Sequence, residues 1–248
     1  MKSIAIILFS LFISCDSKKE IEQIVPVKGN ICIIIDDFGN SMNETIMDFV
    51  SLKNDITFAV IPGLPYTKEF ARLADSLEIE TIIHMPMENK EYEGEYADYL
   101  LHERLNATEV KKRVNLAFSE IPNAIGMNNH QGSKATTSLQ LMKDLARTLK
   151  PLNLYFIDSF TNPKSLAFIT MRRYGVKTEL RQIFLDHIEE EQYVRSQLDS
   201  LVILSKEMHV AIGIGHATKP LTIEILKSEI PKLKSEGYRF LKASEIVR

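Results

Sequence analysis

Apolar runs and amphipathic stretches alternate along most of the chain. Runs such as Ile31 to Ile35, Ile56 to Ile61 and Leu152 to Ile157 predict strands that are buried on both faces. Between them lie segments with apolar residues at helical spacing, for example Ser41 to Leu52 and Thr137 to Leu149. This alternation of strand and helix favours a parallel sheet covered by helices, either open or closed into a barrel.

The remaining expected elements follow the same order. Further strands are expected at Glu80 to His84, Ala124 to Asn128, Val176 to Thr178, Ile183 to Leu185, His209 to Ile214 and Tyr238 to Leu241, and further helices at Thr67 to Leu77, Asn106 to Phe118, Ser165 to Tyr174, Glu189 to Met208 and Ile223 to Ser235. Proline cannot continue a strand ladder, so Met85-Pro86 should end one strand. Thr108 is the expected N-cap of the helix after it. The charged stretch Glu88 to Leu101 is expected to form the rim of a cleft.

Length and composition fit one large domain. The chain has 248 residues, of which 45% are hydrophobic and 25% charged, and α/β barrels often reach this size as a single unit. The net charge is −3, and the basic residues are scattered. Without a basic stripe, nucleic-acid binding has little support.

The first residues predict export. Lys2 precedes an apolar run from Ile4 to Ile13, which is too short to span a bilayer, where ~20 residues are needed. Ser14-Cys15 after this run resembles the bacterial lipoprotein cleavage site, and a plain cleaved signal is the alternative. We therefore expect an export signal over 1–15, a tether over 16–28 and the folded domain over 29–248, held at the membrane of the cell envelope only through a lipid on Cys15.

The first predicted strand ends in Asp36-Asp37. Adjacent strand residues point to opposite faces, so one carboxylate is expected to enter a site while the other braces it or joins it from the rim. Two neighbouring acids in an apolar setting need a cation or a shared proton to relieve their repulsion. This makes a metal site one interpretation. The alternative is that both residues cap the helix that begins near Ser41.

Polar residues end five of the predicted strands. They are Asp36-Asp37, His84, His130, Asp158-Ser159 and His216. In parallel α/β folds the carboxyl ends of the strands lie on one face, where ligands and catalytic groups collect. A single histidine at a strand end is more often structural, but the whole set indicates one site.

Imidazole and carboxylate groups together suit Zn²⁺ or another divalent metal ion. A remaining Asp is then a candidate general base and a remaining His a candidate general acid, which is the apparatus for metal-assisted hydrolysis of an amide or ester. The sequence contains neither a Gly-rich phosphate loop nor a Gly-x-Ser-x-Gly motif. Phosphoryl transfer and serine hydrolysis are therefore disfavoured.

Six motifs in order resemble the divergent polysaccharide deacetylases, relatives of the NodB-like carbohydrate esterases. The motifs are 35–39 (IDDFG), 84–88 (HMPME), 128–133 (NNHQGS), 156–159 (FIDS), 184–186 (FLD) and 214–216 (IGH). The resemblance spans about Gly29 to Val247. It implies a distorted (β/α) barrel of about seven parallel strands and a metal-dependent site in a groove that takes an acetylated polysaccharide.

The resemblance also implies roles for single residues. Asp36 would be the general base, Asp37, His84 and His130 the metal ligands, His216 the general acid and Asp158 the residue that orients it. Asn129, Gly132, Ser133 and Ser159 would contact the substrate or the oxyanion.

Two departures from the family pattern affect the expected function. Glu88 stands where ordinary deacetylases of this superfamily have the second histidine of a His-x-x-x-His motif, and no Arg-Pro-Tyr-type motif is present. The leading hypothesis is a metal-dependent deacetylase of an envelope or extracellular polysaccharide. The alternatives are an envelope module that binds glycan or protein without catalysis but keeps the metal site, and another barrel hydrolase such as a metal phosphoesterase.

Overall fold

The computed structural model describes residues 26–91 and 96–248. The expected export signal, the Cys15 expected to carry a lipid and most of the expected tether fall in residues 1–25, outside the described part. No helix within the described ranges is both long enough and apolar enough to cross a membrane.

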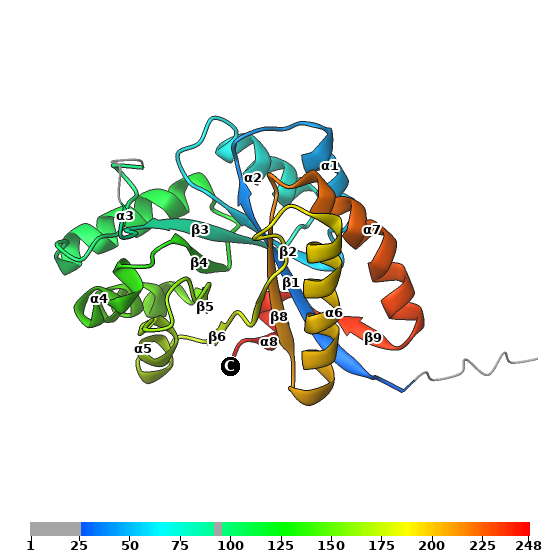
Figure 1. The fold of residues 1–248 in the computed structure, drawn as a ribbon. Helices are drawn as coiled ribbons and strands as arrows, with labels where there is room; N and C mark the ends of the chain where they lie inside the picture. The colour runs from blue at the N-terminus through cyan, green and yellow to red at the C-terminus, as the bar shows by residue number, and fades with distance from the viewer. Residues whose placement is uncertain (1–25, 92–95) are drawn as a thin grey trace, which may run out of the picture.

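Strands and helices alternate along the chain as expected (Figure 1). The strands are β1 (Gly29–Phe38), β2 (Ile56–Val60), β3 (Thr81–Met87), β4 (Gly126–Gln131), β5 (Tyr155–Asp158), β6 (Thr178–Leu180), β7 (Ile183–Phe184), β8 (Ala211–His216) and β9 (Tyr238–Phe240). The α-helices are α1 (Glu44–Val50), α2 (Thr67–Ser76), α3 (Ala107–Glu120), α4 (Leu139–Leu149), α5 (Ala167–Arg173), α6 (Glu191–Glu207), α7 (Pro220–Ser235) and α8 (Ala243–Ile246), and two short 3₁₀ helices are η1 (Ala135–Thr137) and η2 (Lys150–Leu152).

All strand pairs in the sheet are parallel. The order is β6-β5-β4-β3-β2-β1-β8-β7, and β9 adds to the start of β1. β6 pairs with β5 at one end of this order, and β7 pairs with β8 at the other. Only residues 181 and 182 separate β6 from β7, so one short stretch of chain links the two ends of the curled sheet (Figure 1). The predicted distorted (β/α) barrel is confirmed.

The apolar residues form two cores because successive residues of a strand point to opposite faces. In β1, Cys32 and Ile34 belong to the core inside the barrel. Ile31, Ile33 and Ile35 belong to the larger core between the sheet and its helices. Each large apolar side chain buried in this way contributes roughly 1.5–3 kcal/mol. The residues of the interior core therefore identify the face of each strand that points into the barrel.

Two local predictions were wrong. β3 continues through Pro86, because the ladder between β2 and β3 has already ended at Ile83. At Pro86 the chain pairs with β4, and the Pro86 carbonyl accepts a hydrogen bond from the Leu101 N–H. A missing N–H therefore breaks no bond to β2 at that position. The N-cap of α3 is Asn106, not Thr108: its side chain accepts a hydrogen bond from the Glu109 N–H, and Glu109 bonds back to it.

The short helix α8 packs against the interior core at the opposite end of the barrel from the strand ends, through Ala243 and Ile246. Glu80, just before β3, ties this helix to the barrel. Its carboxylate accepts hydrogen bonds from the Thr57 hydroxyl at 2.9 Å, from the Tyr155 hydroxyl at 3.1 Å and from the backbone N–H of Ser244 at 3.1 Å. One side chain therefore joins three segments that are distant in sequence.

Replacing Glu80 with alanine should lower the free energy of unfolding by about 1–3 kcal/mol, because two part-buried hydroxyls and the exposed Ser244 N–H lose their acceptor together. Chemical denaturation measures this change. Glu69 is exposed on α2 and is the matched control, and Glu69→Ala should change stability by less than about 0.5 kcal/mol. Equal stabilities of the two variants would contradict the prediction.

Candidate active site

The alternation that places apolar side chains inside the barrel also places the polar ones. Asp36 comes two residues after the interior residue Ile34, and His84 comes two residues after Ile82. His216 follows Ile214 at the same spacing. These side chains therefore form the next layer of the barrel interior, at the carboxyl ends of the strands, where ligands collect in parallel folds.

The backbone at Asp37 brings both aspartates of β1 to one side. Asp37 has a φ of 68°, and the pairing of β1 with β2 shifts between Ile35 and Phe38, which marks a bulge. A non-glycine residue in this region costs about 1–3 kcal/mol. The next residue, Phe38, anchors this turn in the core, because its ring stacks on the ring of Phe70 with centroids 4.6 Å apart. The bulge explains why the two carboxylates do not point to opposite faces.

The alternative that Asp36 and Asp37 cap the first helix is wrong. The N-cap of α1 is Asn43, whose side chain accepts a hydrogen bond from the Ile46 N–H at 3.1 Å. Both aspartates instead approach His84 on β3: its Nε2 lies 3.5 Å from Asp36 Oδ2 and 3.3 Å from Asp37 Oδ1.

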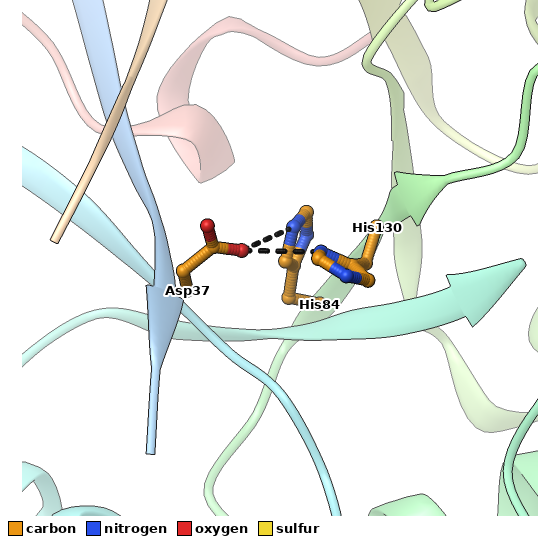
Figure 2. Close-up of side chains that lie close together, drawn as sticks. All are labelled: Asp37, His84 and His130. Carbon is orange, nitrogen blue, oxygen red and sulfur yellow. Dashed lines mark hydrogen bonds and ion pairs between the residues drawn. The ribbon is translucent and has the colours of Figure 1, made fainter. Parts of the chain in front are cut away.

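Asp37, His84 and His130 converge from β1, β3 and β4 (Figure 2). Asp37 Oδ1 lies 3.3 Å from His84 Nε2 and 3.1 Å from His130 Nδ1. One atom from each residue, a carboxylate oxygen or a ring nitrogen, lies within 4.8 Å of the other two. The rings of His84 and His130 meet edge to face, with their centroids 4.9 Å apart.

Hydrogen bonds behind the triad fix the orientation of His84. Its Nδ1 lies 2.7 Å from the side-chain oxygen of Asn128, and the Asn128 amide nitrogen donates to Asp36 Oδ1 at 2.7 Å. An amide oxygen only accepts, so His84 Nδ1 carries a proton, and Nε2 is the nitrogen that faces Asp37. Such a second partner is what orients a metal-binding histidine.

The two aspartates differ in their electrostatics. Burial raises the pKa of Asp36 above its usual value, and the nearby histidines oppose this only in part. Burial also acts on Asp37, but hydrogen bonds from His130 and His84 hold the pKa of its carboxyl well below the usual range. Burial opposes protonation of His84, yet Asp36 and Asp37 raise its pKa. Asp37 is thus the fixed anion of the pair and Asp36 the one that readily exchanges a proton.

The triad fits a divalent metal ion. Two imidazoles and one carboxylate form the donor set typical of Zn²⁺ and related ions, and a site with three protein ligands leaves a position for water or substrate. His84 Nε2 faces Asp37, and this nitrogen would give up its proton to bind the ion, while Nδ1 keeps its contact with Asn128. Asp37, His84 and His130 are the residues that would hold the ion.

Glu88, at the position of the missing histidine, plays a different part. Its buried carboxylate lies 3.0 Å from Lys134 Nζ and accepts a hydrogen bond from the Glu103 N–H at 3.3 Å. The second imidazole comes instead from β4, where His130 stands beside Pro86 in the strand register. The second imidazole therefore comes from a neighbouring strand, and not from the second position of a His-x-x-x-His motif.

His216 on β8 stands directly beside Asp36 in the register of β1 with β8. Its Nδ1 lies 2.7 Å from Asp186 Oδ1, and its backbone N–H donates to Asp186 Oδ2 at 2.8 Å. The Thr222 hydroxyl also donates to Asp186 at 2.8 Å. Burial opposes protonation of His216, but Asp186 outweighs it and raises the pKa to about 9. His216 is therefore an imidazolium at neutral pH.

The prediction that Asp158 orients His216 is wrong. Asp158 faces away from the interior and accepts hydrogen bonds from the Ser165 hydroxyl at 2.7 Å and from the backbone of Phe160 and Phe168. The interior residue of β5 is Ile157, so Asp158 points the opposite way. Asp186, two residues after the interior residue Phe184, has the required orientation and orients the histidine instead.

The four residues expected to contact substrate, Asn129, Gly132, Ser133 and Ser159, differ in whether their polar groups are already hydrogen-bonded. The amide of Asn129 is already used, since it donates to the Gln131 carbonyl at 2.7 Å and accepts from the Ser159 N–H at 2.9 Å. Gly132 has a φ of 86° and turns the chain after β4. Ser133 lines a cavity of about 730 Å³. The buried Ser159 hydroxyl has no hydrogen-bond partner in the described part of the chain. Their roles towards substrate stay predictions.

Three residues near the site were missed or misassigned. Asn128 had a signal, since it precedes His130 by two residues and so shares its face. Asp186 lies in the motif 184–186, but the general-acid partner was assigned to Asp158. Arg181 lies between two strands of three and two residues, too short to show any periodicity.

The contact between His216 and Asp186 predicts how the pKa of His216 responds to a substitution. Asp186→Asn should lower the pKa of His216 from about 9 towards 6.5, because the largest favourable charge is removed. In the wild type a raised pKa means that this pair stabilises the fold below about pH 6.5 and that the contribution is lost as the pH rises through 9. An NMR titration of the His216 ring measures the shift. An unchanged pKa in the variant would contradict the assignment.

Comparisons with known proteins agree with the fold. The sequence profile of the divergent polysaccharide deacetylases matches residues 33–247, so the chain belongs to this family. An uncharacterised protein of Haemophilus influenzae is 35% identical over 209 residues, which cover 84% of this chain and 74% of that protein. The uncharacterised protein YibQ of Escherichia coli is 31% identical over 220 residues, covering 88% of this chain and 67% of that one.

Solved structures share the architecture. An uncharacterised protein of Agrobacterium tumefaciens has a TM-score of 0.82 at 18% identity and covers 89% of this chain and 90% of its own. The CE4 domain of a multidomain xylanase from a Trinervitermes trinervoides hindgut metagenome has a TM-score of 0.50 at 15% identity, covering 88% and 89%. A CE4 family pseudoenzyme from Bacillus anthracis has a TM-score of 0.53 at 16% identity, covering 89% and 66%. At identities this low, the TM-scores show that these proteins share the fold of this chain.

Proposed function

We propose that this protein is a metal-dependent deacetylase that removes acetyl groups from a polysaccharide of the cell envelope. One observation carries the proposal: Asp37, His84 and His130 bring three potential metal ligands together beside a second aspartate, Asp36. Asp36 in turn neighbours His216, which Asp186 holds in place. Family membership supports the substrate class. The export signal expected over 1–15 supports a substrate outside the cytoplasm.

Asp36 acts as the general base. Asn128 occupies its Oδ1 at 2.7 Å, which leaves Oδ2 on the side of His84 as the oxygen that takes a proton from water. Burial raises its pKa, so the carboxylate is a stronger base than an exposed aspartate and holds the proton more readily. The Asn128 contact keeps the carboxylate in place during this transfer.

His216 acts as the general acid. Its pKa of about 9 keeps the ring protonated at neutral pH, and Asp186 fixes Nδ1, so Nε2 is the nitrogen that donates to the departing amine or alcohol. The base and the acid have pKa values shifted by different surroundings, which is the usual sign of an acid–base pair. A divalent ion bound by the triad would supply the Lewis acid that lowers the pKa of water and polarises the acyl carbonyl.

Release of acetate tests the proposal. The purified chain, supplied with Zn²⁺ or another divalent ion, should free acetate from an acetylated glycan, measured by an enzyme-coupled acetate assay on chitin oligosaccharides, acetylated xylan and peptidoglycan. Added chelator should abolish the release. No acetate from any of these glycans with metal bound would overturn the proposal.

A second function has one observation in its favour. Glu88 replaces the second histidine of the ordinary motif, a change that would suit an envelope module that binds glycan or protein without catalysis. Complementation of a deletion strain separates the two. If Asp36→Asn restores the phenotype as well as the wild type does, the non-catalytic module is favoured, whereas its failure favours the deacetylase.

A further inference from the structure

Arg181 is a charged residue near the site that the proposed mechanism does not use. It follows β6 directly, and its backbone N–H donates to the Asp158 carbonyl, which continues the ladder between β5 and β6. Its guanidinium lies over the ring of Phe184, 3.6 Å from the centroid, and the same ring packs on His216 with centroids 5.8 Å apart. Two carboxylates stabilise its charge, Asp158 first and Asp36 second. Arg181 therefore borders the candidate reaction centre.

The guanidinium is held in a fixed position. Nε donates to the Ser159 carbonyl at 2.7 Å and Nη2 to the Phe160 carbonyl at 2.9 Å. Phe160 has a φ of 49°, which turns this carbonyl after β5. With the Phe184 ring beneath it, the planar group is fixed by three contacts. A group fixed in advance loses little entropy when it binds a ligand.

The same guanidinium has donors left over and no ion-pair partner. Arginine has five N–H donors, of which two are used in these bonds, so Nη1 keeps both of its hydrogens and Nη2 keeps one. Asp158 and Asp36 attract its charge, but within residues 26–91 and 96–248 no carboxylate is close enough to form an ion pair with it. Burial lowers its pKa to about 10, which shows that the surroundings disfavour the charge. Arg181 is half-buried, and a charge partly removed from water in this way is stabilised by a direct anionic partner.

We propose that Arg181 binds a carboxylate of the substrate through its free Nη1 and Nη2 edge, so that the preferred substrate is an acetylated sugar that carries an acid group. The remaining edge matches the two oxygens of a carboxylate. This inference rests on the proposed function, since it names the substrate class of the same site. The competing explanation is that Arg181 only ties the turn after β5 to the end of the barrel.

The adjacent cavity supports a negatively charged ligand. The turn that Arg181 holds continues into Thr161, which lines the cavity of about 730 Å³ next to the site. Lys90, Lys164 and Glu91 line the same cavity, and neither of these two lysines forms an ion pair with a described residue. The lysines of this lining outnumber its one acidic residue, which favours an anionic ligand.

Binding of a small carboxylate tests the inference without any turnover. The purified chain, treated with EDTA so that no metal competes for the carboxylate, is titrated with D-glucuronate and with D-glucose, which lacks the acid group. Isothermal calorimetry gives the Kd, and the Nε–Hε signal of Arg181 in NMR reports the site directly. Glucuronate should bind and shift this signal, while glucose should do neither.

Variants separate ligand binding from a purely structural role. Arg181→Gln should weaken glucuronate binding by about tenfold or more, and Arg181→Lys, which keeps the charge but loses the planar edge, by roughly three- to tenfold. Arg172→Gln is the matched control, since Arg172 is an exposed arginine on α5 that also lies over a phenylalanine ring. It should leave the Kd unchanged.

Three outcomes would overturn the inference: equal binding of glucuronate and glucose, unchanged glucuronate binding in a folded Arg181→Gln, or a loss that occurs with His216→Gln but not with either Arg181 variant. If Arg181→Gln does not fold, the NMR signal of the wild type and the Arg181→Lys variant decide. Because no step of this test needs acetate release, a failure of the deacetylase proposal and a failure of the carboxylate site give different results.

Discussion

His130→Ala should abolish stoichiometric metal binding. The triad offers only three protein ligands, and removing one leaves Asp37 and His84, whose donor atoms lie 3.3 Å apart. Loss of a residue that only orients a ligand already weakens metal affinity by about 10–100-fold, so loss of a ligand should weaken it by more than about 100-fold. Elemental analysis after gel filtration should find about one equivalent of ion in the wild type and almost none in the variant.

His209→Ala is the matched control for this experiment. His209 is exposed just before β8, at the opposite end of the barrel from the triad, and should leave the metal content unchanged. His84→Ala should behave as His130→Ala does. Wild-type protein that takes up no ion even after reconstitution would contradict the metal site, and equal metal content in His130→Ala and the wild type would remove His130 from the ligand set.

The fold could be predicted from the sequence because its signals are local. The apolar run of β1 and the helical spacing of α4 each identify an element, and the strict alternation of strand and helix identifies a parallel sheet. Closure into a barrel has no such signal. It depends on β6 and β7, which have three and two residues and pair with strands at the two ends of the sheet. Only the resemblance to a known family predicted it.

The sequence predicted which strand ends carry the site residues, but not the direction in which each side chain points. A polar residue after a buried strand identifies the edge of the sheet, and this placed Asp36, His84 and His216 together. A strand that is buried on both faces is apolar on both, so its sequence does not reveal which residue faces the interior. For that reason Asp158 was mistaken for the partner of His216, although the interior side of β5 continues in Ser159.

The bulge in β1 was equally hidden. A regular strand would have sent Asp36 and Asp37 to opposite faces, and nothing in an Asp-Asp pair announces the left-handed φ of 68° at Asp37. That conformation costs about 1–3 kcal/mol. In return, it lets the carboxylates of Asp36 and Asp37 both approach the ring of His84. Strain of this kind is expected at functional sites and is not encoded by residue type alone.

Asp36→Asn should keep the metal and lose the catalysis. Asparagine retains an oxygen that can accept the Asn128 hydrogen bond, which measures 2.7 Å in the wild type, so the local structure should persist. It cannot take a proton from water, and loss of a general base costs about 10²–10⁴ in rate. We therefore expect kcat for acetate release to fall by about 1,000-fold at neutral pH, with metal content close to the wild-type value.

The two measurements on Asp36→Asn, acetate release and metal content, separate three explanations. Retained metal with lost activity assigns Asp36 to the chemistry, because Asp37 holds the anionic position in the triad and its pKa is kept low by both histidines. Lost metal would mean that the Asp36–Asn128–His84 chain is needed to orient His84 for binding. Undiminished acetate release would exclude Asp36 as the base. Asp75→Asn, an exposed aspartate on α2, controls for the substitution itself and should leave both measurements unchanged.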